Sequence, residues 1–195
     1  MSEVSQTQDI QAQITQAYLD LEAARTHLAE LRRQLPCTTV ADYQLTGPDG
    51  ASVKLSSLFG DQSDMIVIHN MGTGCAYCTL WADGFNGVVP HFENRAAFVV
   101  ISPDDFTTQQ AFALERGWRF RMVSSQGTTF RADLGFQTAD DLMPGYTVLH
   151  KDANGTITDV GKDFFGPGDN YSAIWHMFDL LPEGLNGWEP QFHYE

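Results

Sequence analysis

One stretch of the chain decides the fold: MIVIHNMGTGCAYC, residues 65–78. Its first four residues, 65–68, form a continuous apolar run, which is typical of a strand buried on both faces. A glycine-containing loop follows, and two cysteines then open a helix-length segment over 76–93. A second apolar run, AAFVVI, occupies 96–101. This order predicts a strand–helix–strand unit, and its crossover should be right-handed.

Cys75 and Cys78 are the residues best suited to chemistry. A helix N-terminus has free amide hydrogens and carries about half a positive charge, so it favours a thiolate. The pKa of a thiol, ~8.5 when unperturbed, falls towards ~7 in such a setting. Cys75 lies nearer the helix start and should be the exposed nucleophile. Cys78, one turn further along, should be the more buried resolving thiol.

The two cysteines also admit interpretations without redox chemistry. They could be half of a zinc site, but zinc needs two more ligands, and the sequence has no second CxxC and no paired histidines. They could also be an inert remnant of a redox site. We favour redox chemistry, and we expect neither a metal nor a cofactor.

Four further residues are candidates for supporting roles. His69 ends the first buried strand and could accept a proton from Cys78, although the favoured interpretation is a hydrogen-bonded core histidine with no catalytic role. Pro144 precedes a predicted strand. A cis proline opposite the cysteines would present a backbone edge to an incoming extended chain, and a trans proline in a loop is the alternative. Trp81 and Tyr77 lie on the cysteine-bearing helix, where the expected role of Trp81 is core packing.

The rest of the domain alternates strands with helices. Pro90 should kink or end the helix that starts at Cys75. The turn signals GPDG and DANG each separate two strand candidates. The further predicted elements are strands 43–45, 52–55, 120–123, 145–150 and 156–161 and helices 107–116, 128–134 and 170–181. Together they predict an α/β fold with a central mixed sheet flanked by helices on both faces.

A long N-terminal helix is predicted in front of this domain, over residues 6–35. Its apolar side chains recur in alternating steps of four and three, which is a heptad seam. The seam consists of Ile10, Ile14, Ala17, Leu21, Ala24, Leu28, Leu31 and Leu35. Pro36 should stop the helix. The seam could pack on its own domain or pair with a second chain, and the flanking Asp20 and Arg25 favour a homodimer.

The predicted organisation therefore has three parts. They are a helical extension over 1–36, a domain over 37–183 and a tail over 184–195. The tail carries several aromatic side chains. We expect it to lie against the domain, because apolar surface of this size is normally covered.

Composition argues against several classes of partner. The chain has 195 residues, with 25 acidic against 11 basic side chains and a formal net charge of −14. Nucleic acid and anionic membranes require clustered Lys and Arg, so neither is expected as a partner. No apolar run approaches the ~20 residues that span a membrane, and no signal peptide is predicted. Three cysteines, two of them spaced CxxC, fit a reducing cytoplasm better than a secreted disulfide framework.

Two motifs are more distinctive than the rest: WADGF at 81–85, three residues after the second cysteine, and GWRF at 117–120. Further characteristic segments are 42–50, 99–102, 123–125 and 130–135. The chain resembles an uncharacterised bacterial thioredoxin-like family, a domain of unknown function near the alkyl hydroperoxide reductase and thiol-specific antioxidant group. The resemblance spans most of the chain. It implies a thioredoxin-like fold without a settled activity.

The resemblance also implies roles for individual residues. Cys75 matches the attacking cysteine of thioredoxin-like proteins, Cys78 matches the resolving cysteine, and Pro144 matches the cis-proline. His69 stands where thioredoxins keep a buried acid. Gly74 replaces the tryptophan that is common before the first cysteine, so substrate docking should differ.

Three functional hypotheses follow. The leading one is a thiol–disulfide oxidoreductase whose partners are protein or small-molecule disulfides and thiols. The second is a thiol peroxidase of the peroxiredoxin type. Peroxiredoxins need Thr or Ser three residues before the reactive cysteine, where this chain has Gly72. The third is a non-enzymatic dimeric scaffold that retains the fold.

Overall fold

The computed structural model describes residues 3–195, so the first two residues of the expected extension lie outside the described part. The chain divides into two compact units, one ending at Pro36 and the other spanning Cys37–Glu195. In chain order the elements are α1 (Glu3–Arg32), β1 (Thr38–Val40), β2 (Gln44–Thr46), β3 (Ser52–Lys54), the 3-10 helix η1 (Leu55–Phe59), β4 (Asp64–His69), α2 (Ala76–Asn86), α3 (Val89–Arg95), β5 (Ala97–Ser102), α4 (Phe106–Arg116), β6 (Arg121–Ser124), α5 (Phe130–Asp133), β7 (Gly145–Lys151), β8 (Ile157–Phe164) and α6 (Ile174–Phe178).

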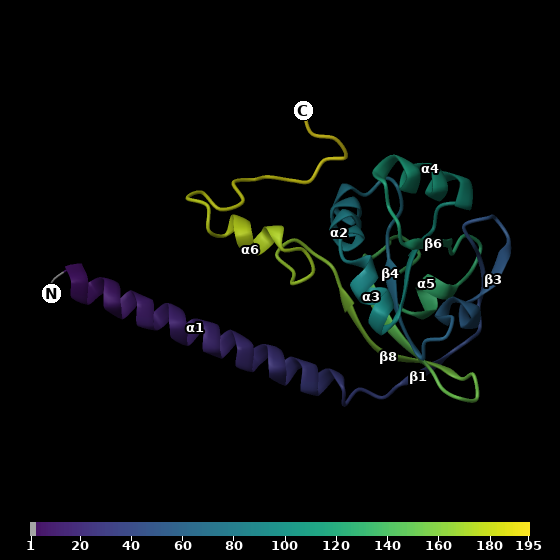
Figure 1. The fold of residues 1–195 in the computed structure, drawn as a ribbon, viewed down its shortest axis with the longest axis horizontal. Coiled ribbons are helices and arrows are strands. Elements are labelled where there is room, and N and C mark those ends of the chain that lie inside the picture. The colour runs from purple at the N-terminus through teal and green to yellow at the C-terminus, as the bar shows by residue number, and fades with distance from the viewer. Residues whose placement is uncertain (1–2) are drawn as a thin grey trace. The chain divides into compact units, whose positions relative to one another are not determined.

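The first unit is one long α-helix, α1 (Figure 1). The sequence predicts this helix over 6–35, and it ends at Arg32. The backbone hydrogen bonds donated by Gln34 and Leu35 span three residues instead of four, a tightening that is usual at helix ends. The apolar side chains of the seam are exposed, for example Leu21 at 62% and Leu28 at 46%. Among residues 3–195, no helix is long and apolar enough to cross a membrane.

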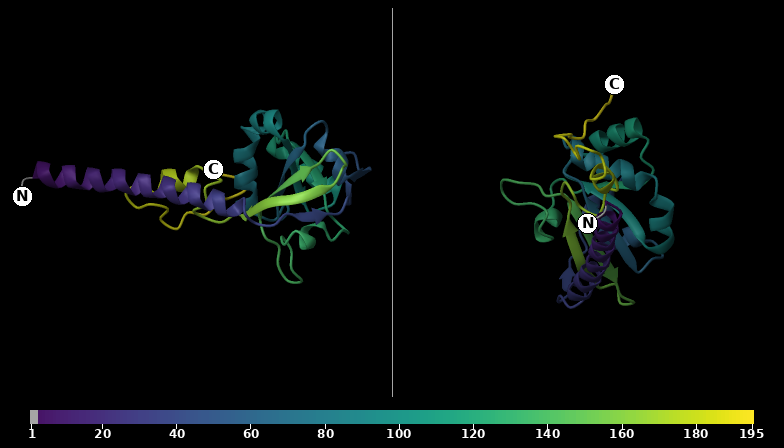
Figure 2. Two further views of the ribbon diagram at one scale, coloured as in Figure 1. Left: turned by 90° about the horizontal axis from the view of Figure 1, so that it is seen from below. Right: turned by 90° about the vertical axis from the view of Figure 1, so that its left-hand side faces the viewer.

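The second unit is built on one mixed sheet with the strand order β1-β8-β7-β4-β5-β6-β2-β3. β4, β5 and β6 are parallel, as the predicted strand–helix–strand unit requires. β7 pairs antiparallel with β4, and the β7–β8 and β2–β3 hairpins lie towards the two edges. Figure 2 shows the twist of the strands from two directions. The central mixed sheet predicted from the sequence is confirmed.

Two hydrophobic clusters cover the two faces of this sheet. On β4, Met65 and Val67 belong to one cluster, together with residues of η1 and α5. Ile66 and Ile68 pack in the other cluster, together with residues of α2, α3 and α4. Side chains alternate between faces along a strand, which explains why neighbours on β4 belong to different clusters. The cysteine-bearing helix α2 therefore covers the face opposite to η1 and α5.

The segment predicted as one helix over 76–93 forms two helices. α2 ends at Asn86, and α3 begins at Val89 after a short turn. Pro90 lies in the first turn of α3, where a proline is well tolerated because its missing N–H would have no helical partner. Pro90 therefore starts a second helix and does not kink the first one late in its course.

Two further elements differ from the prediction. β1 has three residues and pairs with β8 at the edge of the sheet, and no apolar run marks it in the sequence. α6 covers only 174–178 of the helix predicted over 170–181. The Asp169 carboxylate accepts the backbone N–H groups of Tyr171 and Ser172. These bonds hold the chain in a turn where the helix was expected to begin.

The C-terminal tail, residues 184–195, lies against the rest of the second unit, as expected from its aromatic content. The carbonyl oxygen of Phe192 accepts a hydrogen bond of 2.6 Å from Arg116. The ring of Phe192 meets the ring of Phe112 edge-on, with 6.2 Å between centroids. In Figure 1 the tail returns towards α4, which carries both of these partners.

Candidate functional site

The two thiols lie at the N-terminus of α2, where the sequence predicts them. Cys75 is the N-cap residue, and its Sγ accepts a hydrogen bond of 3.0 Å from the N–H of Cys78. The first turn of a helix leaves this N–H without a backbone partner, so the sulfur satisfies it. Cys75 is half-buried, whereas Cys78 is only 3% exposed. One sulfur is therefore open to a substrate and the other is enclosed.

The two thiols differ strongly in acidity. A hydrogen bond from the thiol of Cys78 lowers the pKa of Cys75 to about 7, with help from backbone N–H groups of the first turn and against the effect of burial. The same hydrogen bond, followed by burial, raises the pKa of Cys78. At neutral pH Cys75 is therefore partly a thiolate, which is the nucleophilic form of cysteine, while Cys78 keeps its proton.

The loop before Cys75 is held by two polar side chains. The side-chain oxygen of Asn70 accepts the N–H of Gly72 at 2.8 Å, and the Asp104 carboxylate accepts the N–H of Thr73 at 2.9 Å. Gly72 has a φ of +107°, and a Cβ there would lie 2.9 Å from Asp104 Oδ2. Position 72 therefore requires glycine. The positive φ would strain the hydroxyl-bearing residue that the peroxiredoxin pattern places there.

His69 does not contact the thiols and is a hydrogen-bonded core histidine, the favoured of its two interpretations; it does not accept a proton from Cys78. Its ring is fully buried, stacks on Phe136 with 3.8 Å between centroids, and places Nε2 3.0 Å from the Thr147 hydroxyl. Burial, followed by the positive charge of Arg131, lowers the pKa of His69, so the ring is neutral. Phe136 belongs to the cluster on the η1–α5 face, whereas Cys78 belongs to the cluster on the α2 face.

The segment Met143–Pro144 corrects a second expectation. No peptide bond within residues 3–195 is cis, so Pro144 follows a trans bond. The N–H of Met143 donates to Phe136 at 3.0 Å, and its carbonyl oxygen accepts from Arg131 at 3.2 Å. The carbonyl oxygen of Pro144 accepts the N–H of Phe165 at 2.9 Å. These internal bonds occupy the backbone edge that was expected to receive an extended chain.

Trp81 and Tyr77 belong to an aromatic layer around the start of α2. Trp81 is buried and packs against Phe165, with 5.2 Å between ring centroids, which is the core role expected for it. The ring of Tyr77 lies 6.2 Å from that of Trp81 and 6.3 Å from that of Trp175 on α6. The segment that follows β8 therefore packs beside the turn that carries the thiols.

Arg131 is a residue of this region that was not predicted from the sequence. It is only 1% exposed, whereas arginine side chains are almost never fully buried. Its guanidinium group donates hydrogen bonds to the backbone carbonyl oxygens of Asn70, Ile101, Phe136 and Met143. The available sequence signal is its spacing from the buried Leu134, the C-cap residue three positions later, which places both on one face of the short helix.

Comparison with known sequences gives the family. One bacterial protein family, DUF899, described as "Bacterial protein of unknown function", matches residues 3–193. The chain belongs to this family. The resemblance to an uncharacterised bacterial family that was predicted from the WADGF and GWRF segments is thus confirmed. No curated protein matches the sequence of this DUF899 protein.

Peroxiredoxins are among the solved structures similar to this DUF899 protein. Peroxidoxin BcpB from Mycobacterium tuberculosis is 28% identical, with a TM-score of 0.51, and the match covers 63% of this chain and 81% of that chain. A cysteine-to-serine mutant of PrxQ from Xylella fastidiosa is 15% identical, with a TM-score of 0.53, over 67% of this chain and 87% of that chain. The second match is a likeness of fold alone. The thioredoxin-like fold predicted for the chain is confirmed.

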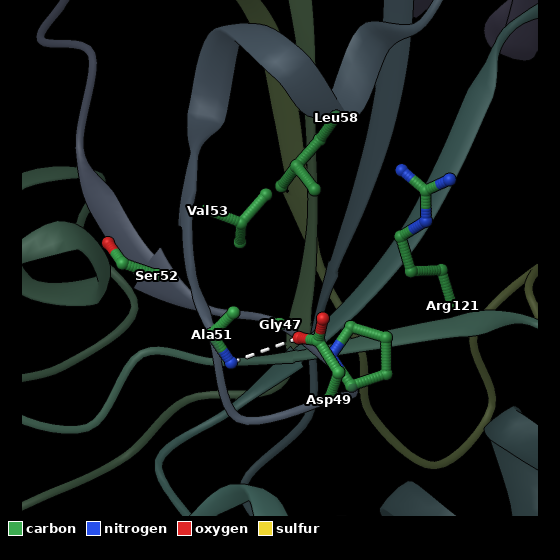
Figure 3. Close-up of a pocket in the computed structure, with 8 residues that line it drawn as sticks. Gly47, Asp49, Ala51, Ser52, Val53, Leu58 and Arg121 are labelled. Carbon is green, nitrogen blue, oxygen red and sulfur yellow. Dashed lines mark hydrogen bonds between the residues drawn. The ribbon is translucent and has the colours of Figure 1, made fainter.

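A pocket of about 410 Å³ in the DUF899 protein lies away from the thiols (Figure 3). It is formed by the turn of the β2–β3 hairpin, by Leu58 and by Arg121 of β6. Within the turn, the Asp49 side chain accepts the N–H of Ala51 at 2.9 Å. Neither Cys75 nor Cys78 lines this pocket. In the part of the chain that the structure describes, no group of three or more His, Cys, Asp or Glu side chains is placed to hold a metal ion.

The acidity of Cys75 predicts a pH profile for this DUF899 protein. The rate at which iodoacetamide alkylates Cys75 should rise through a midpoint near the pKa of about 7, read by mass spectrometry of the peptide. The same peptide in denaturant should show a midpoint of ~8.5, as for an ordinary thiol. Since folding lowers this pKa, ionisation of Cys75 adds stability as the pH rises between these midpoints, and that stability is lost as the pH falls through about 7. Equal midpoints in the folded and denatured states would argue against thiolate stabilisation.

Proposed function

We propose that this protein is a thiol–disulfide oxidoreductase in which Cys75 and Cys78 form the redox pair. The observation that supports this most is the difference in exposure and acidity between the two thiols. Cys75 is accessible and has a pKa of about 7, and Cys78 is buried, protonated and hydrogen-bonded to it. Such a pair is suited to attack by the first sulfur and resolution by the second.

The proposed reaction conserves two electrons. The Cys75 thiolate attacks one sulfur of a substrate disulfide and forms a mixed disulfide. The first substrate sulfur leaves as a thiolate and takes a proton from water. Cys78 then loses its proton and attacks Cys75, so the mixed disulfide breaks and the second substrate thiol leaves with that proton. The protein ends as the Cys75–Cys78 disulfide and the substrate ends as two thiols. An external dithiol resets the pair, which fits the cytoplasm that we expect as its compartment.

The backbone around Pro144 bears on the class of substrate. Met143 and Pro144 use their backbone groups in bonds to Phe136, Arg131 and Phe165. A substrate chain therefore cannot dock there by adding a strand. We propose that the partner is a small-molecule disulfide or an exposed disulfide of a folded protein, either of which reaches Cys75 without such pairing.

A thiol peroxidase is the second candidate, because the similar solved structures are those of peroxiredoxins. In that reaction Cys75 would break the O–O bond of a peroxide and become a sulfenic acid. Cys78 would then form the disulfide and release water. The glycine required at position 72 removes the hydroxyl side chain of the peroxiredoxin pattern, which favours the reductase. Assaying peroxide and disulfide consumption side by side with the same dithiol distinguishes the two activities.

We propose further that α1 forms a parallel homodimer through its seam. Leu21 and Leu28 are exposed apolar residues of the seam, and water-exposed apolar stripes of this kind pair in coiled coils. Asp20 lies five residues before Arg25, which is the separation at which flanking charges of opposite sign meet across a parallel pair. If a dimeric scaffold were the only function, substitution of the cysteines would change little.

A charge in the seam should dissociate this dimer. The Leu21→Glu variant places an unpaired carboxylate in the middle of the interface, so the mass measured by sedimentation should fall from two chains to one. The matched control is Leu19→Glu. Leu19 is 59% exposed, against 62% for Leu21, but it lies outside the seam, so this variant should leave the mass unchanged. A wild-type protein that sediments as a monomer at micromolar concentration would refute the interface.

A further inference from the structure

Arg131 carries a charge that is buried without a carboxylate partner in hydrogen-bond contact. Its side chain is 1% exposed, and its hydrogen bonds go to backbone carbonyl oxygens. Burial lowers the pKa of Arg131 to about 10, so the group stays positive at neutral pH. Burying an unpaired charge is costly. The position of Arg131 next to the redox pair suggests that its buried charge acts on one of the thiols.

One peptide group joins this charge to the buried thiol. Arg131 Nη1 donates a hydrogen bond of 2.7 Å to the carbonyl oxygen of Asn70. The next atom along that peptide, the nitrogen of Met71, donates its hydrogen to Cys78 Sγ at 3.4 Å. The C=O of Asn70 and the N–H of Met71 belong to the same planar amide. A cation at the oxygen polarises the amide and strengthens the hydrogen bond that its N–H donates.

The sulfur at the end of this chain needs such help. In the mixed disulfide, Cys78 must become a thiolate before it can attack. Its hydrogen bond to Cys75, burial and the negative charge of Cys75 raise the pKa of Cys78, whereas the Met71 N–H and the Arg131 charge lower it. His69, the proton acceptor suggested by its place in the sequence, lies on the other face of the sheet.

We propose that Arg131 is a positioning residue that stabilises the Cys78 thiolate through the Asn70–Met71 peptide. The proposal rests on the proposed oxidoreductase function, because it assigns the group that promotes the resolving step. Once substrate is bound to Cys75, the negative charge of Cys75 is gone and no longer repels a thiolate on Cys78. Arg131 then stabilises the Cys78 thiolate without this opposing effect. Asp104 is the carboxylate that offsets part of the Arg131 charge, and His69 is neutral. The proton leaves Cys78 for the departing substrate thiol.

The first test measures the acidity of Cys78 in a Cys75→Ser background, which removes the Cys75 charge as the mixed disulfide does. Ionisation is followed by thiolate absorbance and by the alkylation rate of Cys78 against pH. Adding Arg131→Met should raise the midpoint by about one pH unit or more, as expected for loss of a nearby opposite charge. With Arg131→Lys in place of Arg131→Met the positive charge is kept, so the midpoint should return part of the way to that of the Cys75→Ser protein. An unchanged midpoint in a folded Arg131→Met protein would overturn the proposal.

The matched control is Arg116→Met. Arg116 is also largely buried, but it pairs with Asp83 and with the tail, and the structure gives it no contact with either thiol. Its loss should leave the Cys78 midpoint unchanged. An equal shift in Arg116→Met and Arg131→Met would show a general effect of lost packing and would overturn the specific role of Arg131.

A second measurement does not depend on whether Arg131 variants fold. In the Cys75→Ser protein, the amide proton of Met71 should shift downfield in NMR spectra as Cys78 ionises, with the same midpoint. No response of that amide would overturn the proposed link. Both measurements follow an acid–base equilibrium and need no turnover. A protein that shows the linkage but reduces no disulfide would disprove the proposed function alone.

Discussion

The Cys75→Ser variant should reduce disulfides no faster than the dithiol in the assay does by itself. A serine hydroxyl can still accept the N–H of Cys78 as an N-cap, so the helix start should be preserved. What is lost is the thiolate, the only form of the side chain that attacks a disulfide. The measurement is the rate at which a chromogenic disulfide releases its thiol, with protein and dithiol present together.

Two other cysteine variants serve as controls for this result. Cys37 is exposed and outside the CxxC motif, so Cys37→Ser should keep the wild-type rate. Cys78→Ser should complete the first attack and then stop as a mixed disulfide on Cys75, visible by mass spectrometry. Wild-type turnover in Cys75→Ser would disprove the assigned nucleophile. Peroxide consumption without disulfide reduction in the wild type would favour the peroxidase.

A methyl group at position 145 should destabilise the protein by about 3 kcal/mol, at the upper end of what overpacking usually costs. Gly145 opens β7, where its Cβ would lie 2.3 Å from the carbonyl oxygen of Asp163 and 2.6 Å from the Phe136 ring. Asp163 lies on β8, the strand paired with β7, and its backbone cannot move without breaking the hydrogen bonds between the two strands. Urea unfolding of Gly145→Ala, followed by circular dichroism, should therefore show a much lower midpoint.

Gly161 provides the matched control for this prediction. It lies on β8, and a Cβ there would meet no atom within 4 Å. The Gly161→Ala variant should remain within about 1 kcal/mol of the wild type, because alanine costs less backbone entropy than glycine in a strand. If both alanine variants unfold at the wild-type midpoint, the close packing between β7 and β8 around position 145 is incorrect.

The fold was predictable because its central residues carry strong signals. The apolar runs of β4 and β5 flank the cysteine-bearing helix, and only a buried parallel pair joined by a crossover accommodates that order. β1 was missed because its pairing with β8 joins segments far apart in the sequence. The break between α2 and α3 was misplaced because Pro90 is compatible with a helix start as well as with a kink.

The site was predictable only where local sequence determines it. Cys75 and Cys78 share one helical turn, so their spacing fixes their geometry. The position of His69 depends on which face of the sheet α2 covers, and the order of residues on β4 does not reveal that. Arg131 comes from α5, more than fifty residues after the cysteines, and the carbonyl groups it bonds belong to β5 and to separate loops. Such a contact arises from the tertiary fold alone.

A redox titration of the two CxxC thiols tests the central claim most directly. The protein is equilibrated in buffers of graded thiol-to-disulfide ratio, quenched with acid, and analysed by mass spectrometry of the peptide that contains both residues. We predict that Cys75 and Cys78 oxidise together, as one two-electron couple bonded to each other, with a midpoint inside the range of the buffers. A peptide that keeps both thiols free at every ratio, or that oxidises only one of them, would contradict the account.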